Sequence, residues 1–144
     1  MPGNEDEKIA ATCVRWRPCS QTDSEKNSNN SRQVLVTAMT NGLIEHWNVG
    51  SKDASPWDEI INHQDTVNVM DYTCDGQKLL VAGGDRHVHV YGEQTCQLIS
   101  SMHSDGLKVP GHKNRIFSLR CHPKDANICV TGGWDGMMKI YDLR

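Results

Sequence analysis

The alternation of apolar and polar positions repeats three times along this chain. Three segments begin with an apolar run, pass through a polar turn and end in an alternating strand: residues 34–49, 78–93 and 127–142. The turn residues are Asn41, Asp85 and Asp135, which are 44 and 50 residues apart. A period of two places successive side chains on opposite faces of a sheet, and it is clearest in HVHVY at residues 87–91. The pattern predicts three copies of one β-strand unit.

The turns, and the segments before them, add further repeated features. Asn41-Gly42 and Asp135-Gly136 are dipeptides that favour tight hairpin turns, because such turns need positive φ. Upstream, His63 and His112 each open a polar bend, and a strand is expected three or four residues later. Each unit therefore contains a histidine, a strand, a turn, a strand, an Asp or Asn turn, a strand and an aromatic residue. The aromatic residues are Trp47, Tyr91 and Tyr141.

This arrangement resembles the WD-repeat family of β-propellers. The resemblance rests on Gly111-His112 at the start of the third unit and on Tyr141-Asp142 at its end, with Tyr where Trp is more usual. Repeats of about 40–45 residues are typical of the family. The first unit has no Gly-His, and Trp47-Asn48 and Tyr91-Gly92 are degenerate forms of the terminal dipeptide. Covering about residues 8–144, the resemblance implies an all-β fold of three WD-type antiparallel blades in an incomplete β-propeller.

We expect three repeats behind a short, acidic, disordered N-terminus. The predicted ranges are 1–7 for this tail, 8–61 for the first repeat, 62–104 for the second and 105–144 for the third. Residues 20–32, SQTDSEKNSNNSR, have too few apolar side chains to order themselves, so they predict a mobile loop. This loop is either a tolerated insertion, which we favour, or a partner-binding or phosphorylated segment. Residues 50–60 and 100–112 are interpreted as connections between repeats.

The third repeat is expected to lack its outer strand, because a WD-type blade has four strands and the sequence stops at Arg144. A closed ring typically has 4–8 blades. Either the chain is an N-terminal fragment of a longer propeller, which we favour, or it completes a ring with other chains. Both explanations leave an open sheet edge whose backbone groups promote association. We therefore expect self-association through this edge.

The family resemblance also implies a hydrogen-bonded chain inside each blade. In the third repeat it would consist of His112, Thr131, Asp135 and Tyr141. In the second it would consist of His63, Asp85 and Tyr91, with Ala82 at the hydroxyl position, and in the first of Thr37 and Trp47, with Asn41 for the aspartate. A histidine suits this role because one ring nitrogen donates while the other accepts.

The same residue types could form a catalytic triad. However, the set recurs at the same strand positions in successive repeats, as expected of a scaffold, whereas an active site would occur once. We therefore assign these residues a structural role and predict no catalytic residue.

Ligand-type residues also occur in pairs. These pairs are Cys121-His122, Cys13 with Cys19, and His87 with His89, and none completes the four ligands of a zinc site. The sequence has no phosphate-cradling glycine motif. We expect no metal and no cofactor.

Composition narrows the remaining choices. The 144 residues carry a net charge of −3, which gives no electrostatic case for binding nucleic acid or a membrane surface. No apolar run approaches the roughly 20 residues of a membrane span, and the N-terminus has no features of a secretory signal. We expect a cytoplasmic location, with a nuclear one also compatible. In either compartment the six cysteines are expected to be reduced thiols rather than disulfides.

Two functions follow. The first is a non-enzymatic scaffold or adaptor whose partners are other proteins or peptides. The alternative rests on Tyr141-Asp142-Leu143-Arg144, which resembles the W-D-x-R box of propellers that act as substrate receptors of cullin-RING ubiquitin ligases. In that alternative Arg144 contacts the partner. Recovery of a ligase adaptor that depends on Arg144 would distinguish the two functions.

Overall fold

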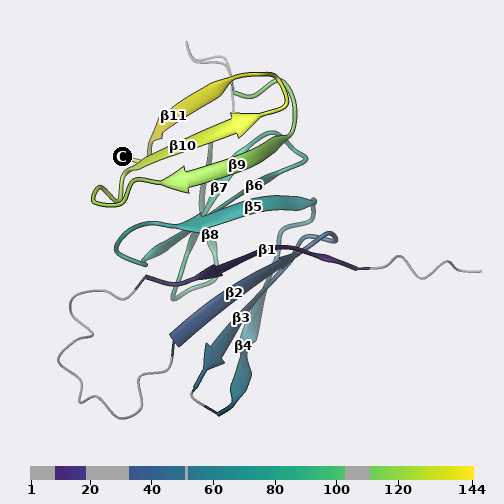
Figure 1. Ribbon diagram of the computed structural model, residues 1–144, viewed down its shortest axis with the longest axis vertical. Coiled ribbons are helices and arrows are strands. Elements are labelled where there is room, and N and C mark those ends of the chain that lie inside the picture. Colours follow the sequence, from purple (N-terminus) through teal and green to yellow (C-terminus); the bar gives the residue numbers. More distant parts are fainter. Residues whose placement is uncertain (1–8, 19–32, 51, 103–110) are drawn as a thin grey trace, which may run out of the picture.

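The computed structural model describes residues 9–18, 33–50, 52–102 and 111–144 (Figure 1). These residues form eleven β-strands and no helix. No helix in these ranges could therefore cross a lipid bilayer. The predicted tail at residues 1–7 and the predicted loop at residues 20–32 lie outside the described residues, so both remain predictions.

The strands form three antiparallel sheets. Sheet one contains, in spatial order, β1 (Ala11–Trp16), β2 (Gln33–Met39), β3 (Leu43–Val49) and β4 (Ala54–Asn62). Sheet two contains β5 (Val67–Tyr72), β6 (Lys78–Gly83), β7 (Val88–Gly92) and β8 (Leu98–Met102). Sheet three contains β9 (Ile116–Cys121), β10 (Ile128–Gly133) and β11 (Met138–Asp142). Within each sheet the chain steps from one strand to its neighbour.

The three sheets follow one another along the long axis of the molecule, with sheet two in the middle (Figure 1). The first strand of each sheet lies at an edge, and β5 contacts both β1 and β9. The sheets therefore lie side by side like blades, without closing a ring. Within residues 111–144, sheet three has three strands. The predicted all-β, incomplete propeller is confirmed.

Sheet two is buried on both faces. One apolar cluster joins it to sheet one and includes Ile44, Met70 and Leu79, while a second joins it to sheet three and includes Leu80 and Ile116. All five side chains are fully buried. Burying each one contributes roughly 1.5–3 kcal/mol. Two-sided burial explains why β6 reads as a continuous apolar run rather than as an alternating one.

The interpretation of residues 50–60 and 100–112 as connections was wrong in part. Residues 54–62 form β4, and β8 includes residues 100–102, so each segment contributes to an outer strand. An outer strand is held by backbone hydrogen bonds to one neighbour and needs few buried side chains. The first three residues of β8 are accordingly exposed, and its sequence LISSM lacks the alternation of apolar and polar positions by which a strand is recognised.

The three Asn or Asp turns share one backbone conformation. Only the residue after the Asn or Asp has positive φ: Gly42 at 85°, Arg86 at 70° and Gly136 at 73°. Its amide donates to the carbonyl three residues back, at 3.0 Å from Gly42 to Met39. This geometry is a four-residue turn that ends in a left-handed residue, rather than a two-residue turn with positive φ at both positions.

Candidate functional site

Sheet three contains the most complete form of the predicted hydrogen-bonded chain. His112 lies in the bend before β9, and its Nδ1–H donates to both oxygens of Asp135 at 3.0 Å. Its Nε2 accepts from the Thr131 hydroxyl of β10 at 2.7 Å. Gly133 makes room for the ring, because a Cβ on Gly133 would lie 2.7 Å from His112 Nδ1. The fold thus brings three of the four predicted residues together.

Tyr141 is the exception in sheet three. Its hydroxyl is buried and meets no described residue in hydrogen-bond geometry, although the Thr131 side chain is near enough to lower its pKa. Burial raises the pKa of Tyr141, since the phenolate would be poorly solvated. The predicted hydrogen bond from Tyr141 stays a prediction, since the Thr131 oxygen that donates its own hydrogen to His112 can still accept from the Tyr141 hydroxyl.

Asp135 accepts from the backbone as well as from histidine. The amides of Lys113 and Met137 donate to its two oxygens at 2.8 and 3.0 Å. Desolvation alone would raise the pKa of Asp135, but the hydrogen bonds from Lys113, His112 and Met137 lower it to about 2. This carboxylate is therefore ionised at neutral pH and connects the turn to the bend.

Sheet two arranges the same residue types differently. His63 Nδ1 lies 2.7 Å from the Tyr91 hydroxyl, whereas its Nε2 lies 4.0 Å from Asp85, too far for a hydrogen bond. Asp85 instead accepts from His89 Nε2 at 2.5 Å. Ala82 has no hydroxyl, so the Tyr91 hydroxyl reaches His63 in its place. A direct His63–Asp85 hydrogen bond was expected and is not formed.

Sequence reasoning missed His89 as a member of this group. Its Nδ1 lies 2.7 Å from the Ser101 hydroxyl on β8, so the ring bridges two strands and the turn. The available signals were its position four residues after Asp85 and its pairing with His87 as a ligand-type residue. Burial and the neighbouring His89 ring both lower the pKa of His63.

Sheet one retains only part of the chain. Trp47 Nε1–H donates to the Thr37 hydroxyl across β2 and β3 at 3.4 Å. Asn41 has no histidine partner among the described residues, but its Oδ1 accepts from the Leu43 amide at 3.2 Å. Asp85 and Asp135 make the same bond to the amides two residues later. This local bond explains why the first turn keeps Asn without a histidine.

A second polar group that sequence reasoning missed lies between sheets one and two. Glu93 is almost fully buried, accepts from the Tyr72 hydroxyl at 3.1 Å and lies 3.3 Å from His46 Nε2. Arg17 Nε lies 3.9 Å from the same carboxylate. Trp57 of β4 stacks on His46, with ring centroids 4.5 Å apart. A buried carboxylate with these partners fixes how the two sheets meet.

Arg144 lies at the surface and pairs with Asp142. Its Nε donates to both carboxylate oxygens, at 2.9 and 3.1 Å. The pairing lowers the pKa of Asp142 to about 2, through hydrogen bonds from the Arg144 side chain and amide. Nothing in the described ranges favours the ligase-receptor alternative over an ordinary solvated strand end.

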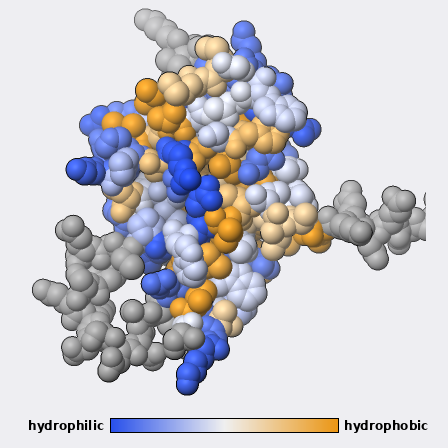
Figure 2. Space-filling view, viewed as in Figure 1, coloured by the Kyte–Doolittle hydropathy of each residue, from blue (hydrophilic) through white to orange (hydrophobic). Residues whose placement is uncertain are grey.

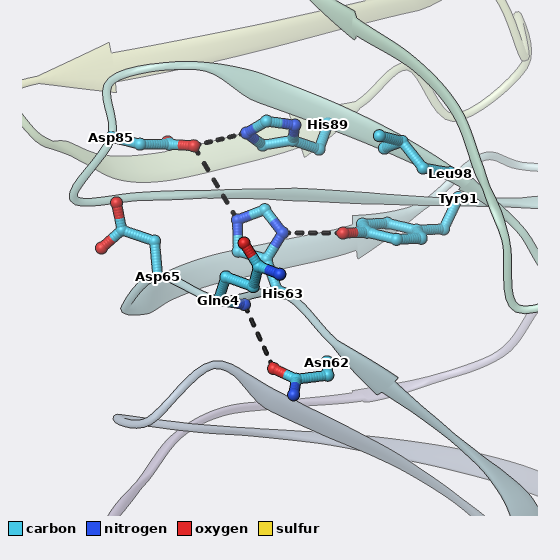
Figure 3. Close-up of a pocket in the computed structure, with 8 residues that line it drawn as sticks. All are labelled: Asn62, His63, Gln64, Asp65, Asp85, His89, Tyr91 and Leu98. Atoms are coloured by element: carbon cyan, nitrogen blue, oxygen red, sulfur yellow. Dashed lines mark hydrogen bonds and ion pairs between the residues drawn. The ribbon is translucent and has the colours of Figure 1, made fainter.

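One open pocket lies beside the sheet-two group (Figure 3). Its wall includes His63, Gln64, Asp65, Asp85, His89 and Tyr91. In Figure 3 the rings of His63 and His89 and the carboxylate of Asp85 point toward one another. Their ligand atoms lie within 4.8 Å of one another. This is where the described side chains could hold a metal ion.

Sheet three has an exposed apolar surface, which we call the sheet-three face. Its members are Phe117, Trp134, Met138 and Ile140, which are 40%, 69%, 70% and 67% exposed. The rings of Phe117 and Trp134 stack with centroids 4.4 Å apart. Figure 2 shows apolar and charged surface interspersed over the region where sheet three lies in Figure 1.

Comparisons with known proteins agree with this architecture. Residues 55–92 and 97–142 match the family model for the WD domain, G-beta repeat. Each match includes the outer strand of one sheet, β4 or β8, and then the three strands of the next sheet. The family repeat is therefore offset by one strand from the sheet. A solved structure of U3-55K superposes with a TM-score of 0.71 at 17% identity and covers 94% of this chain and 37% of that one.

Two relatives extend the comparison. The Ribosome biogenesis protein WDR12 homolog of Drosophila persimilis is 23% identical over 126 residues, covering 81% of this chain and 30% of that protein. Coronin-7 of Rattus norvegicus is 29% identical over 84 residues, covering 56% of this chain and 9% of that protein. The chain thus spans less than a third of either relative. Because the family model matches more than half of the chain, the chain belongs to the WD-repeat family.

Proposed function

We propose that the chain is a non-enzymatic protein-interaction module of the WD-repeat type, and that the sheet-three face contacts the partner. The observation that carries the proposal is the exposure of four large apolar side chains on one small sheet. Soluble proteins rarely expose contiguous apolar patches unless these bind something. Aromatic residues and methionine are also enriched at protein interfaces.

The register of sheet three places Met138 and Ile140 on one face of the sheet. Val130 pairs with Arg120 on one side and with Ile140 on the other, and Gly132 pairs with Met138. Side chains in such rows lie on the same face of a sheet. Arg120 is exposed beside the apolar members, so the surface best fits an apolar segment flanked by carboxylates.

Burial of the His–Asp–hydroxyl set argues against catalysis there. Thr131 is 1% exposed and His112 is 5% exposed, so a substrate has no access to the hydroxyl. A triad nucleophile must reach a substrate carbonyl. The set therefore supports a stabilising role, and the exposed sheet-three face is the better candidate for function.

We also propose a nuclear location for the chain. Relatives named for ribosome biogenesis favour the nuclear alternative over the predicted cytoplasmic location. Imaging of the tagged chain tests this choice: nuclear accumulation is expected, and a uniformly cytoplasmic signal would contradict it.

Quantitative affinity purification with matched variants tests the function. The Met138→Lys/Ile140→Lys double variant adds two charges to the sheet-three face. Leu98→Lys/Ile99→Lys adds them to exposed positions of the outer strand β8. We expect discrete partners to be lost with the first variant and retained with the second, at equal circular dichroism. Equal recovery with both variants would refute the assignment of this face, and purification without any partner would refute the interaction role.

A further inference from the structure

Three metal-ligating side chains converge on one point in sheet two. They come from separate elements: His63 from the bend before β5, Asp85 from the turn between β6 and β7, and His89 from β7. Asp85 Oδ2 lies 2.5 Å from His89 Nε2 and 4.0 Å from His63 Nε2. The two rings meet edge to face, with centroids 4.5 Å apart.

His63 Nε2 is buried and has no hydrogen-bond partner among the residues that the structure describes. The residue is 8% exposed, and this nitrogen faces the Asp85 carboxylate in Figure 3. A buried polar atom without a partner is uncommon, because it has lost hydration and gained nothing in exchange. A metal ion at this point could accept electron pairs from His63, His89 and Asp85 together.

The polar atom of each side chain that does not face this point already lies within hydrogen-bond distance of another residue. His63 Nδ1 lies 2.7 Å from the Tyr91 hydroxyl, and His89 Nδ1 lies 2.7 Å from the Ser101 hydroxyl. Asp85 Oδ1 accepts from the His87 amide at 3.1 Å. Such outer contacts orient histidine and carboxylate ligands in metal sites, and a hydroxyl can rotate to accept from Nδ1–H.

This arrangement is particular to sheet two. The residue four positions after the turn residue is Glu45 in sheet one, His89 in sheet two and Lys139 in sheet three. The repeated WD-type network therefore does not require a histidine at this position. The pocket wall also carries Asp65, whose charge adds to that of Asp85 and favours a cation.

We propose that His63, Asp85 and His89 bind a zinc ion through Nε2, Oδ2 and Nε2, with the fourth coordination position open to the pocket. Two imidazoles and one carboxylate suit zinc better than magnesium or calcium, which prefer oxygen ligands. Zinc bonds of about 2.0–2.2 Å in tetrahedral geometry place ligand atoms roughly 3.3 Å apart. The 2.5 Å contact must therefore lengthen and the 4.0 Å contact shorten, both by less than about 1 Å.

Competition with a chromophoric chelator measures zinc affinity on the purified 144-residue chain, after metal has been removed. His89→Gln should weaken zinc binding by more than about 100-fold, since it removes a ligand. Ser101→Ala removes only an outer contact and should weaken binding by roughly 10–100-fold. His87→Gln, two residues from His89 on the same segment, is the matched control and should change affinity by less than about 3-fold, because the proposed set does not include this side chain.

Cobalt substitution separates this site from the cysteines. The proposed ligands give visible d–d absorption without thiolate-to-cobalt charge transfer. Zinc should also raise the thermal midpoint of the wild-type chain and of His87→Gln, but not that of His89→Gln. Thiolate charge transfer, or equal zinc affinity in His89→Gln and His87→Gln, would overturn the proposal. If His89→Gln is unfolded by circular dichroism, Ser101→Ala decides: unchanged affinity in that variant would also overturn it.

Discussion

Replacing Thr131 by valine isolates one hydrogen bond in sheet three. Thr131 is 1% exposed, and its hydroxyl lies 2.7 Å from His112 Nε2. Valine has nearly the same shape, so the change removes the hydroxyl and leaves His112 Nε2 buried without a partner. The sheet keeps its backbone pairing of Thr131 with Leu119 and Lys139, which confines the effect to the side chain.

The expected loss is about 1–3 kcal/mol in the free energy of unfolding, which is typical when a buried polar group loses its partner. For a chain of this size, 1 kcal/mol corresponds to a change of about 3–4 °C, so the midpoint should fall by roughly 3–12 °C. Chemical denaturation should show a lower midpoint concentration with an unchanged slope, since the area exposed on unfolding is the same.

Two control variants define the result. Thr131→Ser keeps the hydroxyl and should retain more stability than Thr131→Val. Thr12→Val makes the same chemical change at an exposed position of β1 and should shift stability by less than about 0.5 kcal/mol. If Thr131→Val were as mild as Thr12→Val, the stabilising role proposed for the His112 network would be wrong.

Three further predictions concern pH, thiols and association. Hydrogen bonding lowers the folded-state pKa of Asp135 from 3.8 to about 2, so the ionised carboxylate stabilises the fold above pH 4 and loses this effect as pH falls toward 2. The difference in unfolding free energy between wild type and Asp135→Asn should therefore narrow from pH 4 to pH 2. A constant difference would contradict the reasoning. Burial raises the pKa of Cys129 to about 12 and that of Cys121 higher still, so both should react slowly with a thiol reagent until the chain is unfolded. All six cysteines should then react without reductant, and a lower number would indicate disulfides. The purified chain should self-associate through sheet three in light scattering, and Met138→Lys/Ile140→Lys should reduce this; a stable 16.1 kDa wild-type monomer at high concentration would refute it.

The sequence predicted the three inner strands of each sheet because burial shapes their residue pattern. Two-sided burial makes β6 an apolar run, and the alternation of valine with histidine marks β7. The outer strands β4 and β8 were missed because few of their side chains are buried, Ile61 being one of them, and backbone pairing leaves little trace in residue type. The turns were located correctly, but their conformation was not, since Arg86 takes the left-handed position that glycine takes elsewhere.

The polar groups whose residues recur at the family spacing were predicted from the sequence, and the groups outside that spacing were missed. His112, Thr131 and Asp135 follow the family spacing, and the fold brings them together. Glu93 and His46 are 47 residues apart and meet only because two sheets pack, which no local pattern reveals. In the same way, His89 is paired in the sequence with His87, but in space its Nε2 faces Asp85.

Site-specific photocrosslinking tests most directly whether the sheet-three face is an interaction surface. A photoreactive amino acid replaces Met138 on that face or, as a control, Ile99 on β8, and the chain is irradiated in cells. Both positions are exposed, at 70% and 58%, so accessibility is comparable. We expect discrete protein adducts at position 138 and few at position 99. Adducts of equal yield at the two positions, or discrete adducts only at position 99, would contradict the proposed interaction surface.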